Sequence, residues 1–218
     1  MKRIIKRLKK EKKGKTKMCK PLEKIRNKSP EEILEECGAY NQIPIDLGKI
    51  SQHYGISIIP DSFENENADI NDEFEKVIGM VVVNGDNAGI FYSNIYSINR
   101  QRFTVAHEFA HCSLHTNRMQ ENYIEYRKNK LSKEGIEYEA NVFAGELLIP
   151  PKFIYSLYNK TQCAVSLAKS FAVSLQVMCA RLDYLNLKYY ISSDAIKTVS
   201  EELFDLLAFQ KGELSAYA

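Results

Sequence analysis

The segment from His107 to His111 places two histidines and a glutamate at a spacing suited to metal chemistry. Residues four apart on an α-helix lie on one face, about 6 Å apart along the axis, so both imidazoles can bind one ion. Imidazole suits zinc, and a catalytic zinc site has three protein ligands and a water. Glu108 flanks that water and can act as its general base. Because so short a pattern also occurs in unrelated helices, a structural helix with satisfied histidines is the alternative.

A third zinc ligand is expected downstream of this helix. His115 lies about 12 Å along the axis from His107, too far to bind the same ion, so we expect it to be structural or at the rim. In the helix that follows, a helical wheel places Glu137 inside the apolar arc and Glu139 outside it. Glu137 is therefore the expected third ligand, and Glu139 is the alternative. Asn141 lies on the side of Glu137 and is expected to hydrogen-bond a ligand histidine.

Several helices and strands must position these side chains. The stretch from residue 98 to 115 contains no proline or glycine and carries apolar residues on most sides, which predicts a largely buried helix. The ligand-bearing helix is expected from Ser132 to Leu148, before two prolines. Upstream, the patterns predict helices at 29–38 and 46–54, a strand at 56–59, and a hairpin of strands 77–83 and 89–92.

The C-terminal part has the pattern of a helix-turn-helix. Two short helical patterns, 165–171 and 175–185, are separated by three residues that end in Ser174, a suitable N-cap. Residues 152–158 are expected to add a short turn before them. A short strand at 189–191 and a last helix at 199–209 are expected after them.

The charge of the chain is concentrated at its N-terminus. Residues 1–20 hold eleven Lys or Arg and one Glu, a net charge of +10 within a chain whose total is +2. The remaining residues are therefore mildly acidic, and residues 1–28 are predicted to form a solvated, disordered tail. Binding to a nucleic-acid backbone or to an anionic membrane surface is the alternative for this tail.

The cysteines and the hydropathy pattern indicate a cytoplasmic protein. The five cysteines are scattered and include no CxxC pair, which argues against a disulfide framework or a thiolate zinc site. No apolar run of about 18 residues is present, and no apolar stretch of about 7–15 residues follows the basic N-terminus. We therefore expect neither integral membrane association nor export.

Two blocks of sequence together resemble the ImmA/IrrE family of metallopeptidases. The first runs from Arg100 to His111, and the second is Glu137-x-x-Ala140-Asn141-x-Phe143-Ala144-x-x-Leu147-Leu148-Ile149-Pro150. The resemblance covers about residues 40–190, the helix-turn-helix-like segment included. It implies a gluzincin-like site in which His107, His111 and Glu137 bind one zinc ion and Glu108 is the catalytic acid and base. Phe109 stands where the family commonly has leucine, and the basic tail has no counterpart.

The resemblance also implies a function. Members of the family cut a helix-turn-helix transcriptional repressor or antitoxin and so relieve repression in mobile elements, phages or stress responses. The expected activity is thus that of a zinc-dependent endopeptidase with a protein substrate, which could bind as a strand added beside residues 90–92. Two alternatives remain: a DNA-binding regulator that uses the helix-turn-helix-like segment and the tail, and a zinc-binding relative that does not cleave.

The expected fold class is α+β. A small mixed or antiparallel sheet packs on the buried HExxH helix and on a second ligand-bearing helix, and a helix-turn-helix-like subdomain follows. The expected organisation is a tail at 1–28, a metallopeptidase domain at 29–158, the helix-turn-helix-like subdomain at 159–190 and a C-terminal extension at 191–218.

Overall fold

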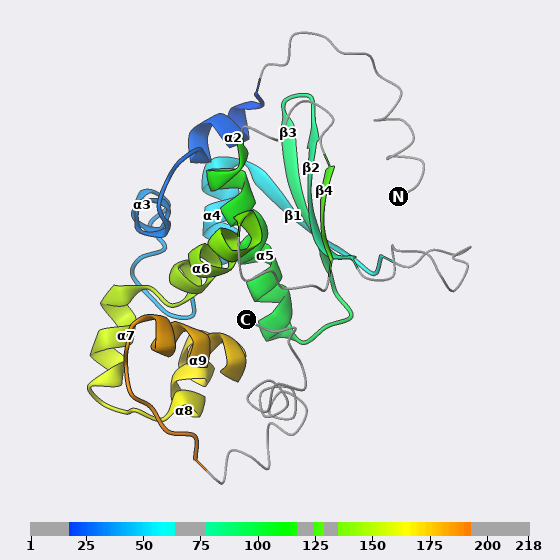
Figure 1. The fold of residues 1–218 in the computed structure, drawn as a ribbon. Helices are drawn as coiled ribbons and strands as arrows, with labels where there is room; N and C mark the ends of the chain where they lie inside the picture. The colour runs from blue at the N-terminus through cyan, green and yellow to red at the C-terminus, as the bar shows by residue number, and fades with distance from the viewer. Residues whose placement is uncertain (1–17, 64–76, 117–123, 129–134, 193–218) are drawn as a thin grey trace, which may run out of the picture.

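The computed structural model describes residues 18–63, 77–116, 124–128 and 135–192, and its fold is α+β, as the sequence predicts (Figure 1). The elements in chain order are α2 (Lys20–Ile25), α3 (Pro30–Glu36), α4 (Leu47–Tyr54), β1 (Ile56–Asp61), β2 (Val77–Asn84), β3 (Asn87–Ser93), α5 (Ile98–Leu114), β4 (Ile124–Lys128), α6 (Ile136–Leu148), α7 (Pro151–Tyr158), α8 (Ala164–Phe171) and α9 (Leu175–Tyr184). The predicted tail up to residue 17, the last helix at 199–209 and most of the C-terminal extension lie outside the described residues.

The sheet is mixed, with the strand order β1-β3-β2-β4. The predicted hairpin is confirmed: β2 and β3 pair antiparallel, and Gly85 at φ 58° supplies the left-handed conformation that a two-residue turn requires. β1 pairs with β3 in parallel, so β3 has a partner on each side. The prediction that β3 takes a substrate as an added strand is therefore wrong, because its backbone groups are already paired.

Helix α5 lies in the interior between the sheet and α6 (Figure 1). Its residues from Thr104 to Ser113 are all buried, and it packs against β2 and β3 on one side. Strand β2 is buried along nearly its whole length, as expected for a strand covered on both faces: Val81 and Val83 join the main core, whereas Val77 and Met80 pack in a separate cluster with Phe63. The predicted buried helix is thus confirmed, and its polar side chains need partners inside the fold.

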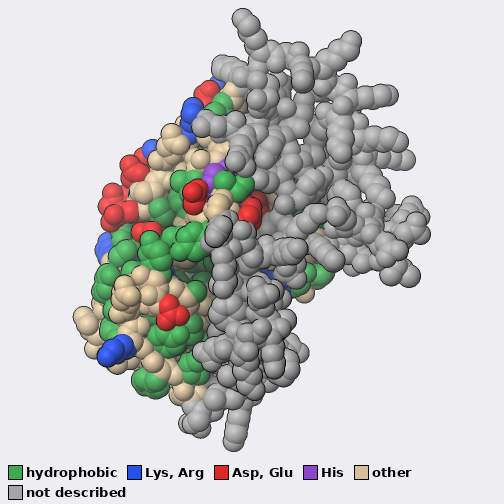
Figure 2. Space-filling view, viewed as in Figure 1, with side chains coloured by type: hydrophobic (Ala, Val, Ile, Leu, Met, Phe, Trp, Pro, Cys, Tyr) green, Lys and Arg blue, Asp and Glu red, His purple; other side chains and the backbone are tan. Residues whose placement is uncertain are grey.

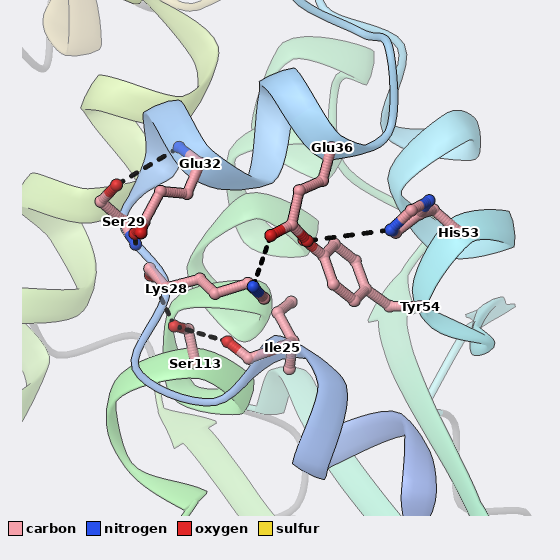
Figure 3. A network of polar contacts seen from close by, with 8 residues as sticks. All are labelled: Ile25, Lys28, Ser29, Glu32, Glu36, His53, Tyr54 and Ser113. Carbon is pink, nitrogen blue, oxygen red and sulfur yellow. Dashed lines mark hydrogen bonds and ion pairs between the residues drawn. The ribbon is translucent and has the colours of Figure 1, made fainter.

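The N-terminal residues described by the structure belong to the folded body, so the predicted end of the tail at residue 28 is wrong. Residues 20–25 form helix α2, whose Leu22 and Ile25 are fully buried in the main core. The buried hydroxyl of Ser113 on α5 shares its one hydrogen between the carbonyl oxygens of Ile25 and Lys28, at 3.1 and 2.7 Å (Figure 3). The basic composition hid this short helix, because its two apolar residues are too few to produce a clear period.

A network of polar contacts joins α3, α4 and Lys28, which lies between α2 and α3 (Figure 3). Ser29 forms a capping box with Glu32 at the start of α3, a helix that the sequence predicts. Glu36, near the end of α3, pairs with Lys28 and accepts a hydrogen bond of 2.8 Å from the Tyr54 hydroxyl. His53 lies 3.8 Å from the same carboxylate, measured from its Nε2 atom. These contacts connect α4 and the segment that follows α2 to Glu36 of α3, and they place His53 beside the same carboxylate.

Replacing Ile25 with alanine tests whether α2 is part of the core. Removal of a fully buried isoleucine side chain should lower the free energy of unfolding by about 2–5 kcal/mol. Urea unfolding followed by circular dichroism measures the change. The control is Lys24→Ala on the exposed side of the same helix, which should stay within about 0.5 kcal/mol of wild type. Equal stability of the two variants would show that α2 is not anchored.

Helices α7, α8 and α9 form a group beyond the end of α6 (Figure 1). The two predicted helices of the helix-turn-helix pattern are confirmed, and they are bent by 108° relative to each other. Ser174 caps α9 by accepting a hydrogen bond of 3.2 Å from the Val177 amide, and Ala172 in the turn has φ 51°. Within the described ranges, no single helix is long and apolar enough to span a membrane, and only the bent pair α8 and α9 passes by length and composition.

Besides the missed helix α2, four elements differ from the sequence predictions. Strand β4 falls in a polar region in which the sequence shows no period, and α7 is an eight-residue helix where a short turn was expected. Helix α6 begins at Ile136, whereas the sequence pattern starts it at Ser132, which lies outside the described residues. The expected strand at 189–191 is a single bridge between Cys163 and Tyr190.

Candidate metal centre

Helices α5 and α6 bring two histidines and a glutamate together. The Nε2 atoms of His107 and His111 lie 2.9 Å apart. The Glu137 carboxylate reaches both, at 3.3 Å from His107 and 3.4 Å from His111. The two histidine side chains are buried, whereas that of Glu137 is 30% exposed. The cluster is therefore enclosed by the fold on the histidine side and open to solvent on the carboxylate side.

The geometry and donor types of this cluster fit a zinc ion. Ligand atoms arranged tetrahedrally about 2.0–2.1 Å from an ion lie about 3.3 Å from one another, close to both carboxylate distances. Two imidazoles and one carboxylate are a donor set typical of zinc, whereas calcium and magnesium prefer oxygen ligands alone. Among the described residues, this is the group of histidine, cysteine and acidic side chains that could hold a metal ion.

Asn141 lies on α6 beside the cluster, where the helical wheel places it. Its Oδ1 atom is 2.9 Å from Nδ1 of His107. An amide oxygen can only accept, so the Nδ1 hydrogen of the imidazole donates to it. The lone pair of His107 then lies on Nε2 and points toward His111 and Glu137. Asn141 thus fixes the ring in the tautomer that a metal ligand needs.

Glu139, the alternative third ligand, lies outside the cluster. Its side chain is 61% exposed, and its Oε2 atom is 3.1 Å from Nε2 of His115. His115 is buried at the end of α5, and its Nδ1 atom is 3.0 Å from Nδ1 of His111. The structure therefore favours Glu137 over Glu139 as a ligand. The contact between His115 and Glu139 depends on how α5 and α6 cross, which no local pattern reveals.

Glu108 lies on the side of α5 that faces strand β2, and it is 1% exposed. Its carboxylate occupies space left by Gly79: a Cβ atom on that glycine would lie 2.6 Å from Glu108 Oε1 and 2.5 Å from Thr104 Cγ2. The absence of a side chain on β2 at this point thus lets the carboxylate fit inside the fold. A glycine within a strand pattern often marks such a close approach, and this signal could have identified Gly79 from the sequence.

Replacing Gly79 with alanine should disturb Glu108. The added methyl group must displace the Glu108 carboxylate or Thr104, both on α5, and such overpacking costs about 1–3 kcal/mol. We expect a lower free energy of unfolding and a loss of peptide cleavage larger than any loss of metal affinity. Urea unfolding, zinc titration and a cleavage assay measure the three quantities.

Gly89 on the neighbouring strand is the matched control for this substitution. A Cβ atom there would meet its nearest neighbour, Ile59 Cδ1, at 3.5 Å, which is an ordinary contact. The Gly89→Ala variant should therefore retain cleavage and stay within about 0.5 kcal/mol of wild-type stability. If both alanine variants behaved like wild type, Gly79 would have no role in placing Glu108.

The first turns of α5 are bonded to the turn between α8 and α9. The Asn99 side-chain amide donates to the carbonyl of Val173, and Arg102 Nε donates to that of Ala172, each at 3.2 Å. Arg102 also donates to the carbonyl of Ile45 at 2.9 Å. Burial lowers the pKa of the Arg102 guanidinium, while Asp46 opposes this shift. The helix-turn-helix unit therefore holds the helix that carries His107, Glu108 and His111.

Arg181 connects α9 to the metal-site helix α6. Its side chain is only 4% exposed, and burial lowers the pKa of its guanidinium. Its Nε atom donates to the carbonyl of Ile149 at 3.3 Å, and Nη2 lies 3.9 Å from Glu146. This basic residue of α9 thus serves packing inside the protein.

An apolar groove of about 380 Å³ lies along the outer side of α6. Its lining residues come from α3, α5, α6 and α9 and are Pro30, Leu114, Tyr138, Glu139, Val142, Phe143, Glu146 and Tyr184. Figure 2 shows hydrophobic side chains beside a histidine and acidic side chains on this face of the molecule. The helix that carries Glu137 therefore also presents an apolar surface to solvent.

Comparison with known proteins gives one family. The model of the IrrE N-terminal-like domain, peptidase family M78, matches residues 51–183, a range that contains both ligand-bearing helices and all but the last residue of the helix-turn-helix unit. No curated protein and no solved structure matches the chain.

Proposed function

The chain belongs to the peptidase M78 family of IrrE N-terminal-like domains, and on this basis we propose that it is a zinc-dependent endopeptidase. One observation carries the proposal: His107, His111 and Glu137 converge to within 4.8 Å of one another, and Glu108 follows the first of them on the same buried helix. Two histidines and a carboxylate with one open side form the three-ligand arrangement of catalytic zinc sites, whereas structural sites are closed by four ligands.

Each residue around the cluster has a separate role in the proposed reaction. His107, His111 and Glu137 would hold the zinc ion, which would supply Lewis acidity to acidify water and polarise a peptide carbonyl. Asn141 keeps His107 in the required tautomer. Glu108 accepts the proton that water loses as it attacks the carbonyl, and it delivers this proton to the amine nitrogen as the peptide bond breaks.

The proposed substrate is a helix-turn-helix transcriptional repressor or antitoxin, and its cleavage would relieve repression. This substrate class rests on the resemblance to the ImmA/IrrE family. The opening of the site on the side of Glu137 supports access by a polypeptide, because that carboxylate is the exposed member of the cluster.

Incubation with a natural candidate tests the proposed activity. The zinc-loaded full chain is mixed with a small helix-turn-helix protein encoded by a neighbouring gene, and mass spectrometry identifies the products. We expect a defined cut that disappears with a zinc chelator and returns with added zinc. A chain that binds zinc yet leaves both this protein and an unfolded general substrate intact would contradict the proposal.

The shape of α8 and α9 raises DNA binding as a second candidate function, since their 108° bend is that of DNA-binding helix-turn-helix pairs. The contacts of this unit favour packing instead. Its turn is bonded to α5 through Asn99 and Arg102, and Arg181 is buried against α6. We therefore propose that it supports the catalytic helix. Salt-sensitive binding of duplex DNA that is lost on substitution of the exposed Lys169 would argue for the second function.

A further inference from the structure

A line of hydrogen bonds runs from the ligand His111 to the surface of α6. His111 Nδ1 lies 3.0 Å from His115 Nδ1, and His115 Nε2 lies 3.1 Å from Glu139 Oε2. His115 is 7% exposed, whereas the Glu139 side chain is 61% exposed. The line thus connects the interior of the metal site to a carboxylate in solvent.

The chemistry of these atoms permits one direction of donation. If His111 offers the lone pair of Nε2 to the ion, its hydrogen lies on Nδ1 and must be donated to His115 Nδ1. His115 then carries its own hydrogen on Nε2, from which it donates to Glu139. A carboxylate accepts only, so Glu139 selects the tautomer of His115, and His115 selects that of His111.

The contact between the two histidines is made through their nitrogen atoms. Their ring centroids are 5.1 Å apart, and the planes are inclined by 49°, so the rings are not stacked. The backbone amide of His115 already ends α5 by bonding to the carbonyl of His111 at 3.0 Å. Because this bond is independent of the side chain, the imidazole of His115 is not needed to cap the helix.

We propose that His115 and Glu139 are positioning residues that orient His111 for zinc binding. Asn141 accepts a hydrogen bond from Nδ1 of His107 and so fixes the tautomer of that ring. His115 and Glu139 together fix the tautomer of His111 in the same way. The proposal rests on the zinc site of the proposed function and adds two residues to it. Loss of such a partner of a ligand histidine lowers metal affinity by about 10–100-fold.

We call the line of hydrogen bonds from His111 through His115 to Glu139 the relay. Its role is tested by the zinc affinity of the full-length chain, measured by competition with a chromophoric chelator. His115→Phe keeps an aromatic ring but cannot accept a hydrogen bond, and Glu139→Ala removes the acceptor at the surface. Each should weaken zinc binding by about 10–100-fold. His115→Asn places an amide oxygen near the position of Nδ1 and should restore most of the affinity. Glu146→Ala, a carboxylate of the same helix that lies beside Arg181, should bind zinc like wild type.

Unfolding of the metal-free variants separates positioning from packing. A positioning role predicts that the metal-free proteins unfold at the same urea concentration as wild type while their zinc affinities differ. Because Glu139 is exposed, its alanine variant gives a result even if His115→Phe fails to fold.

Three outcomes would contradict the relay, and they differ in whether the zinc site and the proposed peptidase function are retained. Wild-type affinity in both His115→Phe and Glu139→Ala would remove the relay but leave the zinc site and the proposed peptidase. If His115→Phe lowered zinc affinity and the free energy of unfolding of the metal-free protein by equal amounts, and if His115→Asn did not restore the affinity, the role of His115 would be packing. A wild-type chain that binds no zinc would remove the relay and the proposed function together.

Discussion

Replacement of Glu108 with glutamine should reduce peptide cleavage by at least about 10²–10⁴-fold while the protein keeps its zinc. Glutamine has nearly the same shape, so it fits the space beside Gly79, but it cannot accept the proton that water must lose. The ligand side chains are unchanged, and zinc affinity should stay within a few-fold of wild type. Cleavage of the proposed helix-turn-helix substrate, followed by mass spectrometry, and metal analysis of the same sample measure both quantities.

The control for this variant is Glu146→Gln on α6. That carboxylate is half-buried beside Arg181 and has no place in the proposed chemistry, so cleavage should be retained. Proteolysis that survives in Glu108→Gln would contradict the proposed role of Glu108. Zinc binding without cleavage in the wild-type chain as well would instead identify a relative that binds metal and does not cleave.

Replacement of Glu137 with alanine should abolish zinc binding at concentrations that saturate the wild type. Structural zinc sites with four ligands are worth about 10–16 kcal/mol, so one ligand contributes roughly 3–4 kcal/mol, or on the order of 10³-fold in affinity. The remaining histidines are buried and 2.9 Å apart, and they cannot supply the third donor. The variant should therefore lose cleavage along with its metal.

Thermal or urea unfolding with and without zinc measures this loss. At a zinc concentration about 100 times its dissociation constant, wild type should gain about 2.7 kcal/mol, whereas Glu137→Ala should gain roughly 0.1 kcal/mol or less. Glu139→Ala should show an intermediate gain, because Glu139 contacts His115 and not the metal cluster. A normal gain in Glu137→Ala together with none in Glu139→Ala would show that the third ligand is Glu139.

The elements that the sequence predicts well are those with strong local patterns. Helix α5 is marked by an unbroken run without proline or glycine, the β2–β3 hairpin by Gly85, and α9 by its Ser174 cap. The apolar arc of α6 likewise separates Glu137 from Glu139. In each case a few neighbouring residues determine the conformation, so no knowledge of distant contacts is needed.

The features that escape prediction depend on contacts between distant segments. The parallel pairing of β1 with β3 involves residues about 32 positions apart in sequence, from Ile56 to Ala88, and no local signal specifies it. Helix α2 is held by burial of Leu22 and Ile25 in the main core and by the Ser113 hydroxyl on α5, and these contacts are with distant segments. The link from His115 to Glu139 likewise exists only once α5 and α6 have packed together.

The role of the helix-turn-helix unit shows why a motif alone does not establish function. The sequence pattern and the 108° bend agree with a DNA-binding unit. The carbonyl groups of its turn are nevertheless bonded to Asn99 and Arg102 of α5, the helix that carries the two histidines of the metal cluster. This unit is connected to the metal site through its contacts with α5. Substitutions in the turn are therefore expected to change zinc binding or cleavage more than DNA binding.

Anomalous diffraction at the zinc edge from crystals of the zinc-loaded full chain tests the central claim most directly. We predict one ion per chain, bound by Nε2 of His107, Nε2 of His111 and the Glu137 carboxylate at about 2.0–2.2 Å, with one coordination position open to water. An ion bound by Glu139 in place of Glu137, a site closed by a fourth protein ligand, or zinc bound only elsewhere in the chain would contradict the account.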